Sequence, residues 1–171
     1  MPDMQAAMPL ASRTMASPLG RLTLVASDRG LRALLWPGDD PKRVPLGPTI
    51  EAPDHSVLLE TERQVSDYFS GRRTAFSVPL DFVGTPFQKQ VWTALLAIPF
   101  GETRSYAEIA AFIGAPKAVR AVGHANGRNP ISIIAPCHRV VGTNGRLTGF
   151  AGGLEAKARL LALESGQAAL L

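Results

Sequence analysis

The sequence predicts a protein of the α/β (α+β) class, with strands in the first half of the chain and helices in the second. Two short apolar runs, 20–26 and 31–36, flank the turn segment 27–30 (SDRG) and predict a β-hairpin. The second half carries apolar residues at helical spacing, with capping residues ahead of them. We place a soft boundary near Val83-Gly84, which divides the chain into domains 1–83 and 84–171.

The rest of the first half predicts a loop, a helix and an edge strand. Segment 37–53 is polar and rich in proline and glycine, which is typical of a loop. Asp54 can cap a helix whose apolar residues recur at helical spacing up to Phe69, and Gly71 ends it. The run 76–82 (FSVPLDF) predicts one more strand, and Pro79 places that strand at a sheet edge.

Two capping signals predict helices in the second half. Segment 85–88 (TPFQ) has a capping residue, proline at the first helical position and glutamine at the third, and Pro99 ends this helix. Segment 105–108 (SYAE) is a second capping box, and the short helix it opens has Ile109, Phe112 and Ile113 inward and stops at Gly114.

A further helix is expected from Pro116 to about Asn126, which makes a helix-turn-helix with its predecessor. Its small residues would let the backbone approach a narrow minor groove, and Arg120 is its main long side chain. An αα-hairpin packed only for the fold fits the same pattern.

The bulk composition excludes some classes of protein. The 171 residues carry a net charge of +4, and no apolar run approaches the roughly 20 residues that a membrane span needs. Charge alone favours an ordinary basic enzyme over a DNA-binding protein. The single cysteine excludes an internal disulfide and fits a reducing compartment. With no secretory signal at the start, we expect a cytoplasmic protein, associated with the nucleoid if it is bacterial.

The segment 129–141 (NPISIIAPCHRVV) is the strongest candidate for a site. Its apolar run 131–135 predicts a buried strand, and Pro136 fixes the chain just before Cys137. Most lone cysteines are small buried hydrophobes. Here the neighbours His138 and Arg139 would favour the thiolate, and a cysteine and histidine that meet form a nucleophile–base pair.

A last helix is predicted over 153–164 (GLEAKARLLALE), with Leu154, Ala158 and Leu161 on its apolar face and a Glu155–Arg159 pair on its surface. Glu164 stands at the C-terminal end, where a carboxylate opposes the helix dipole. A partner such as a histidine would explain this misfit, although a solvated glutamate at a helix end is the commoner case.

From about Gly84 to Glu164 the chain resembles the O6-alkylguanine-DNA alkyltransferases, also called methylated-DNA–protein-cysteine methyltransferases. The resemblance rests on FQKQVW, IPFGETRSYAEIA, RAVGHANGRNP and PCHRVVGTNGRLTGFAGGLEAKARLLALE. It implies a small N-terminal α/β domain of ribonuclease-H-like topology and a mostly helical C-terminal domain with the helix-turn-helix. The first half matches the family much less specifically.

The resemblance implies five catalytic residues. Cys137 matches the acceptor thiol, His138 the base that acts through a bound water, and Glu164 the carboxylate that orients the base. Asn129 matches the residue that braces the turn before the site. Tyr106 matches the hydroxyl that helps to rotate the DNA phosphate and hydrogen-bonds the purine ring.

The resemblance also implies a DNA surface and a base pocket. Arg120 matches the finger that fills the gap left by a flipped base. The other expected DNA contacts are Tyr106, Ala107, Lys117, Ala121, Gly123, Arg139 and Thr143. The expected pocket residues are Pro136, Val140, Phe150 and Ala151, with backbone contacts from Val140 and Ala151 to the base.

These positions imply repair of double-stranded DNA by irreversible transfer of an alkyl group from O6-alkylguanine to Cys137, with base flipping. O4-alkylthymine is a further possible substrate. The expected protein is a monomer that needs no cofactor, and cooperative binding along DNA stays open. Some relatives bind zinc through N-terminal cysteines, which this chain lacks, so no metal is expected. Some carry Tyr-Ser where this chain has Phe150-Ala151.

Three other functions compete with this one. A non-catalytic lesion-binding relative shares the fold but lacks the cysteine, so Cys137 argues against it. A helix-turn-helix transcription factor would use Cys137 structurally, and the small-residue helix counts against that function. A Cys–His hydrolase would turn over and would not need the basic charge.

Overall fold

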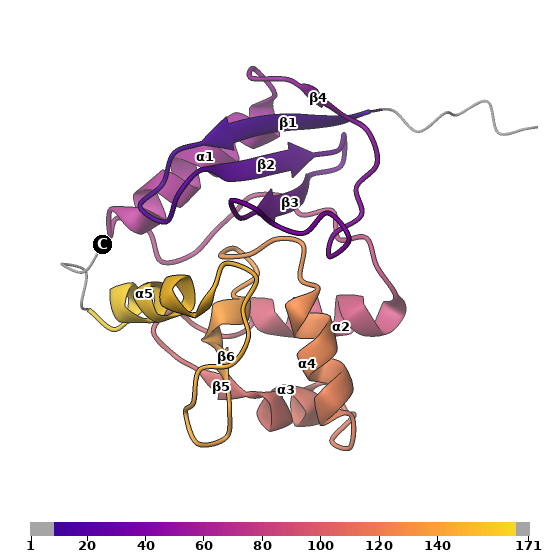
Figure 1. The fold of residues 1–171 in the computed structure, drawn as a ribbon, viewed down its shortest axis with the longest axis vertical. Coiled ribbons are helices and arrows are strands. Elements are labelled where there is room, and N and C mark those ends of the chain that lie inside the picture. Colours follow the sequence, from indigo (N-terminus) through magenta and orange to yellow (C-terminus); the bar gives the residue numbers. More distant parts are fainter. Residues whose placement is uncertain (1–8, 167–171) are drawn as a thin grey trace, which may run out of the picture.

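A four-stranded sheet forms the first half of the chain, with strand order β3-β2-β1-β4 (Figure 1). The strands are β1 (Leu10–Met15), β2 (Leu22–Ala26), β3 (Leu31–Leu35) and β4 (Thr49–Glu51). Strands β1 to β3 pair antiparallel, and β4 runs parallel to β1. The structure is a computed structural model that describes residues 9–166.

The predicted hairpin is confirmed by the antiparallel β2–β3 pair, whose turn is closed by the Ser27 N–H donating to the Gly30 carbonyl at 2.9 Å. Two strand predictions were wrong. Strand β4 lies inside the segment predicted as loop, because it is held by pairing with β1 rather than by its own sequence. Segment 76–82 makes only an isolated bridge between Leu80 and Leu31. Strand β1 was not predicted from the sequence.

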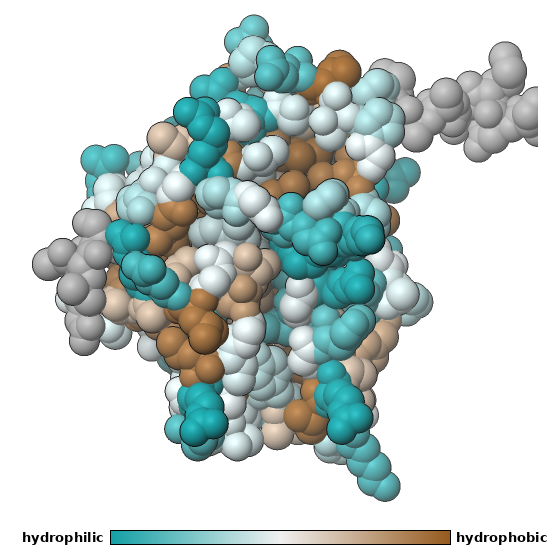
Figure 2. Space-filling view, in the orientation of Figure 1, coloured by the Kyte–Doolittle hydropathy of each residue, from teal (hydrophilic) through white to brown (hydrophobic). Residues whose placement is uncertain are grey.

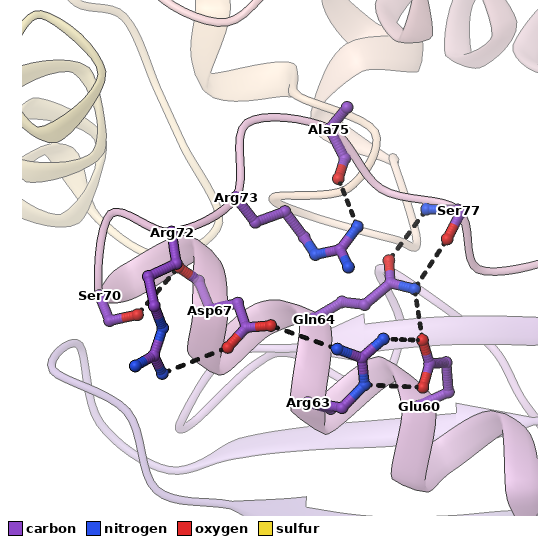
Figure 3. Close-up of polar contacts among 9 residues, drawn as sticks. All are labelled: Glu60, Arg63, Gln64, Asp67, Ser70, Arg72, Arg73, Ala75 and Ser77. Atoms are coloured by element: carbon purple, nitrogen blue, oxygen red, sulfur yellow. Dashed lines mark hydrogen bonds and ion pairs between the residues drawn. The ribbon is translucent and has the colours of Figure 1, made fainter.

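Helix α1 (Ser56–Phe69) packs across the sheet and buries Leu58, Val65 and Tyr68. Its N-cap is His55, whose ring nitrogen accepts from the Val57 N–H, and not the predicted Asp54. The buried Gln64 exchanges two hydrogen bonds of 2.9 Å with Ser77 and so ties the segment after the helix back onto it (Figure 3).

The second half contains α2 (Pro86–Leu96), β5 (Arg104–Ser105), α3 (Tyr106–Phe112), α4 (Val119–Gly127), β6 (Val140–Val141) and α5 (Leu154–Glu164). A 3-10 helix, η1 (Cys137–Arg139), lies between α4 and β6. Both predicted capping boxes are present, at Thr85–Gln88 and Ser105–Glu108. Phe112 is exposed, against the prediction that it points inward.

Three other predictions were wrong in detail. Helix α4 begins at Val119 because 115–118 form a turn, so Pro116 stands outside it. The apolar run 131–135 is buried but is a turn rather than a strand. Helix α5 buries Ala156, Leu160 and Leu163, while the predicted face is exposed at Leu154, and no Glu155–Arg159 ion pair forms within the described part of the chain.

Two hydrophobic clusters make up most of the core. One lies between the sheet and α1 and includes Ile131, Ile133 and Leu160 from the second half. The other lies among α2, α3 and α4 and contains Cys137. The segment just before Cys137 therefore packs into the core of the first half, while Cys137 itself packs into that of the second. The domain boundary near Val83-Gly84 stays a prediction.

The surface shows no broad apolar face in the view of Figure 2, where hydrophobic side chains form small patches among hydrophilic ones. Within residues 9–166, no helix is both long enough and apolar enough to cross a membrane.

Candidate active site and DNA interface

Cys137 opens the 3-10 helix η1 and is only 5% exposed. Its N–H donates to the Ala135 carbonyl at 2.8 Å, which fixes the residue at the end of the preceding turn. Burial raises the pKa of the Cys137 thiol, and the nearby polar side chains of Asn129 and Ser132 oppose that rise only in part. Desolvation thus opposes the effect expected from the neighbours of Cys137, and their stabilisation of the thiolate stays a prediction.

Asn129 organises the turn that carries Cys137. Its side-chain amide donates to the Ala135 carbonyl at 2.8 Å, and its oxygen accepts from the Ile131 N–H at 3.0 Å. Ile133 in this turn has a φ of 72°, a conformation that β-branched residues rarely adopt. A strained turn held by one buried amide keeps Cys137 in a fixed place.

His138 and Glu164 meet at the centre of the molecule. The His138 Nε2 lies 2.6 Å from Glu164 Oε2, and His138 is fully buried. Burial alone would raise the pKa of Glu164, but hydrogen bonds from His138 and Arg139 lower it to about 2. Because Glu164 is a carboxylate, Nε2 carries the imidazole proton and Nδ1 carries the lone pair.

The Nδ1 of His138 is buried and has no hydrogen-bond partner within residues 9–166. Burial also lowers the pKa of His138, an effect that Glu164 only partly opposes, so the ring is neutral near neutral pH. A neutral imidazole with a free lone pair, on the residue next to a buried thiol, has the properties of a general base.

Glu164 accepts five hydrogen bonds on its two oxygens. Oε1 accepts from Arg139 Nε at 2.7 Å and from the Gly101 N–H at 3.4 Å. Oε2 accepts from His138, from Arg139 Nη2 at 3.0 Å and from the Tyr68 hydroxyl at 2.6 Å. These hydrogen bonds explain how a carboxylate is tolerated at a helix C-terminus. The predicted contact between Glu164 and His138 is among them.

Arg139 does not lie on a DNA-facing surface. It is 5% exposed, and it also donates to the Ile98 carbonyl at 2.6 Å. The prediction that Arg139 contacts DNA was wrong, because its guanidinium is used in holding Glu164 and the end of α2 together.

Sequence reasoning missed two buried residues of the site. Tyr68 comes from α1, and the buried cation Lys157 donates to the Val140 carbonyl at 2.7 Å. Burial lowers the pKa of Lys157, while the nearby Cys137 has the opposite effect. Lys157 is a charged residue, so the periodicity of apolar residues gave no signal for its burial, and Tyr68 passed as an ordinary core aromatic.

Tyr106 begins α3 and borders the cluster that contains Cys137. Its hydroxyl hydrogen-bonds the Thr148 hydroxyl of the segment that follows β6. Gly123 of α4 faces the Tyr106 ring, where an added Cβ would lie 3.7 Å from it. A hollow of 570 Å³ opens here, lined by Tyr106, Val119, Gly123, His124, Gly127, Arg128 and Gly149.

The expected DNA-contacting residues of the helix-turn-helix lie together on the surface. Lys117, Arg120 and Ala121 are exposed and line a groove of 630 Å³ between α4 and the start of α2. Ala107 is half-buried at the start of α3. The Trp92 indole donates to the Ala125 carbonyl at 2.9 Å, which braces α4 on α2.

The expected pocket residues come from two segments, one just before α5 and one around the thiol. Pro136 and Val140 are buried next to it, whereas Ala151 is exposed on the segment before α5, as is Thr143 after β6. The Phe150 ring packs edge-on against Trp36 at 5.5 Å, and a Cβ on Gly152 would come within 2.7 Å of the same indole. The first half of the chain thus supports the segment that carries Ala151.

No group of three or more histidine, cysteine or acidic side chains within residues 9–166 is arranged to hold a metal ion. The site consists of one buried thiol, one neutral imidazole and a saturated carboxylate, beside a helix-turn-helix. Together these define the class of a cysteine-dependent nucleophile on a DNA-binding fold.

Comparisons with known proteins show which family this is. The model for "6-O-methylguanine DNA methyltransferase, ribonuclease-like domain" matches residues 10–82, and that for the DNA binding domain matches residues 86–166. The methylated-DNA–protein-cysteine methyltransferase of Mycobacterium tuberculosis is 51% identical over 158 residues, covering 91% of this chain and 93% of that protein. The constitutive Bacillus subtilis protein is 47% identical, covering 88% and 93%.

The solved structures agree with the sequence comparisons. The crystal structure of Mycobacterium tuberculosis OGT in complex with DNA has a TM-score of 0.83 at 48% identity, covering 92% of this chain and 94% of that one. The chain therefore belongs to the methylated-DNA–protein-cysteine methyltransferase family, and its mixed α/β first half is the family's ribonuclease-like domain.

Proposed function

We propose that this chain repairs alkylated double-stranded DNA by moving the alkyl group from O6-alkylguanine onto Cys137, once and irreversibly. The observation that carries the proposal is the buried Cys137 followed directly by a neutral histidine that Glu164 holds in one tautomer. The family supports the same reaction, since its curated relatives are named as methylated-DNA–protein-cysteine methyltransferases. A related structure was solved with DNA.

The reaction begins with proton transfer. The Cys137 thiol gives its proton to His138 Nδ1 through a bound water, and Glu164 stabilises the imidazolium that forms. The sulfur then attacks the alkyl carbon, an S–C bond forms, and the bond from that carbon to O6 breaks. The electron pair leaves with guanine, where the Tyr106 hydroxyl donates to the purine ring. The product is a thioether, and the chain has no second cysteine to reverse it.

The target base must leave the duplex, because its alkyl group lies inside the stack. Arg120, which is exposed on α4, fills the gap that the flipped base leaves in the duplex. The small residues of α4 permit a close approach of the helix to the minor groove. Lys117 contacts phosphate on the same face. The flipped base passes Tyr106, which lines a hollow on this face and packs against the cluster that contains Cys137. The protein acts as a monomer and without a cofactor, in the cytoplasm.

Intact-protein mass spectrometry after incubation with a duplex that contains one O6-methylguanine tests the proposal. We expect a stoichiometric gain of one methyl group that maps to Cys137 and is absent from Cys137→Ala. Tight binding to the lesion without a mass change would instead support a non-catalytic lesion-binding protein. Binding to undamaged sequences alone would support a transcription factor, and catalytic turnover would support a hydrolase.

A further inference from the structure

Tyr68 connects the ribonuclease-like half of the chain to the proposed reaction. It lies in the last turn of α1, 96 residues before Glu164 in sequence, and its side chain is 1% exposed. Its hydroxyl donates to Glu164 Oε2 at 2.6 Å. The same oxygen accepts from His138 Nε2 at 2.6 Å, so the two donors share one acceptor.

We propose that Tyr68 is a positioning residue for alkyl transfer, which holds the Glu164 carboxylate in line with His138. The inference rests on the proposed function. It assigns the first half of the chain a part in the chemistry rather than in folding alone.

The geometry around Glu164 explains why such a residue is needed. Arg139 approaches both carboxylate oxygens, from Nε at 2.7 Å and from Nη2 at 3.0 Å. Arg139 thus forms a bidentate fork that engages both oxygens, whereas His138 uses Oε2 alone. The Tyr68 hydroxyl adds a donor from α1 on that same oxygen and so holds Oε2 beside the imidazole.

The tyrosine suits this task because it stays neutral. Burial raises the pKa of Tyr68, and the adjacent Glu164 carboxylate raises it further, so the phenol remains a donor throughout the working pH range. Its ring is fixed by Phe69, Phe76 and Phe100, whose centroids lie 5.4, 5.6 and 6.2 Å away. The Gln64–Ser77 hydrogen bonds hold the segment that carries Phe76 against α1 (Figure 3).

Loss of this donor has a specific consequence for pH dependence. If Glu164 turns away, His138 is no longer fixed with its lone pair on Nδ1, and the thiol loses its base. Transfer then depends on deprotonation by solvent, which grows about tenfold per pH unit below the thiol pKa. Wild-type transfer, by contrast, should be nearly level above neutral pH.

The test compares wild type, Tyr68→Phe and Thr61→Val in single-turnover transfer from an O6-methylguanine duplex. Thr61→Val is the matched control, since it removes another buried hydroxyl from α1, which within residues 9–166 donates only to the Val57 carbonyl. We expect Tyr68→Phe to be about tenfold slower at neutral pH, with the deficit closing as the pH rises toward 9. Thr61→Val should keep the level wild-type profile.

A double variant separates positioning from general support of the fold. In Glu164→Gln the carboxylate is already lost, so adding Tyr68→Phe should slow transfer no further. An equal loss at every pH, or an additional loss in the double variant, would overturn the inference. If wild type itself takes no methyl group onto Cys137, the proposed function fails, whereas normal wild-type transfer with an unchanged Tyr68→Phe profile refutes only the role of Tyr68.

Nuclear magnetic resonance of the wild-type protein gives a test that needs no folded Tyr68 variant. The ring nitrogens of His138 should report a single tautomer protonated at Nε2, and the Tyr68 hydroxyl proton should exchange slowly with water. A rapidly exchanging hydroxyl proton would contradict the inference.

Discussion

Glu164 and Arg120 represent two regions of the molecule that are built in contrasting ways. Glu164 is buried and accepts five hydrogen bonds from four residues. Arg120 is exposed on α4 among small residues, and within residues 9–166 its guanidinium has no ion-pair or hydrogen-bond partner. The Glu164 carboxylate is satisfied within the folded chain, whereas the Arg120 guanidinium is left for a partner to satisfy.

The contrast separates the residues that serve alkyl transfer from the residues that serve DNA binding. A change in the buried region should affect thiol activation and folding on any substrate. A change on the helix-turn-helix face should affect duplex DNA and leave the thiol unaltered.

Glu164→Gln should produce the largest effect. An amide cannot hold His138 and Arg139 as a carboxylate does, so we expect transfer at neutral pH to fall about 100-fold and the thiol pKa to rise. The unfolding free energy should drop by about 3 to 5 kcal/mol, as for other broken buried ion pairs. Single-turnover kinetics, thiol titration and denaturant unfolding measure the three quantities. An unchanged thiol titration would refute the link from Glu164 to Cys137.

Arg120→Ala should lower transfer from duplex DNA by about 10- to 100-fold, because the unstacked base is no longer replaced. Reaction with free alkylguanine base should be unaffected, and so should the thiol pKa. Transfer rates measured in parallel on the duplex and on the free base test this prediction. Equal losses on both would show that the two regions are not separate and would remove the flipping role.

Acid should destabilise the buried region in two steps. His138 has a lowered pKa in the folded protein, so stability falls as the pH drops below about 6.5, where the unfolded ring binds a proton first. The pKa of Glu164 is about 2 when folded and 4.5 when unfolded, so its contribution is complete above about pH 4.5 and is lost toward pH 2. That contribution is on the order of 3 kcal/mol.

Salt distinguishes the buried carboxylate from an exposed one. A hydrogen bond from Arg63 lowers the pKa of Glu60 to about 2 as well, but this pair lies on the surface of α1 (Figure 3). High salt should weaken the Glu60 contribution and leave that of Glu164 largely intact. Unfolding of Glu164→Gln and Glu60→Gln across this pH range, at low and high salt, provides the measurement. An acid loss that salt abolishes would contradict a buried origin.

Lys117→Ala should produce the smallest effect. Loss of one phosphate contact should weaken duplex binding by a few-fold and reduce the salt slope of the binding constant by about 1. Binding titrations over a range of salt concentrations would detect this. A strong dependence on DNA sequence would instead indicate that Lys117 reads bases.

The sequence predicted the parts of the fold that short-range signals determine. The capping boxes at Ser105 and Thr85 and the hairpin at 27–30 are local arrangements, and all of them form. Strand β4 and the turn at 131–135 were missed because their conformations depend on distant partners. An apolar run does not distinguish a buried strand from a buried turn in which Ile133 takes a left-handed conformation.

The same division applies to the site. The motif pointed to Cys137 and His138, and the helix-dipole misfit pointed to Glu164, which the structure brings to His138. The burial of Arg139 could not be foreseen, since it depends on how α5 docks against the end of α2. The role of Tyr68 could not be predicted for the same reason, because only the folded chain brings α1 to Glu164.

The central claim is that Cys137 rests as a buried thiol and becomes nucleophilic only through His138. Titration of the thiolate absorbance of the free protein, set beside the rate of transfer at the same pH values, tests it most directly. We predict no measurable thiolate at neutral pH while transfer is already at its full rate. A free protein that is largely thiolate at neutral pH would contradict the account, because the histidine would then have no proton to remove.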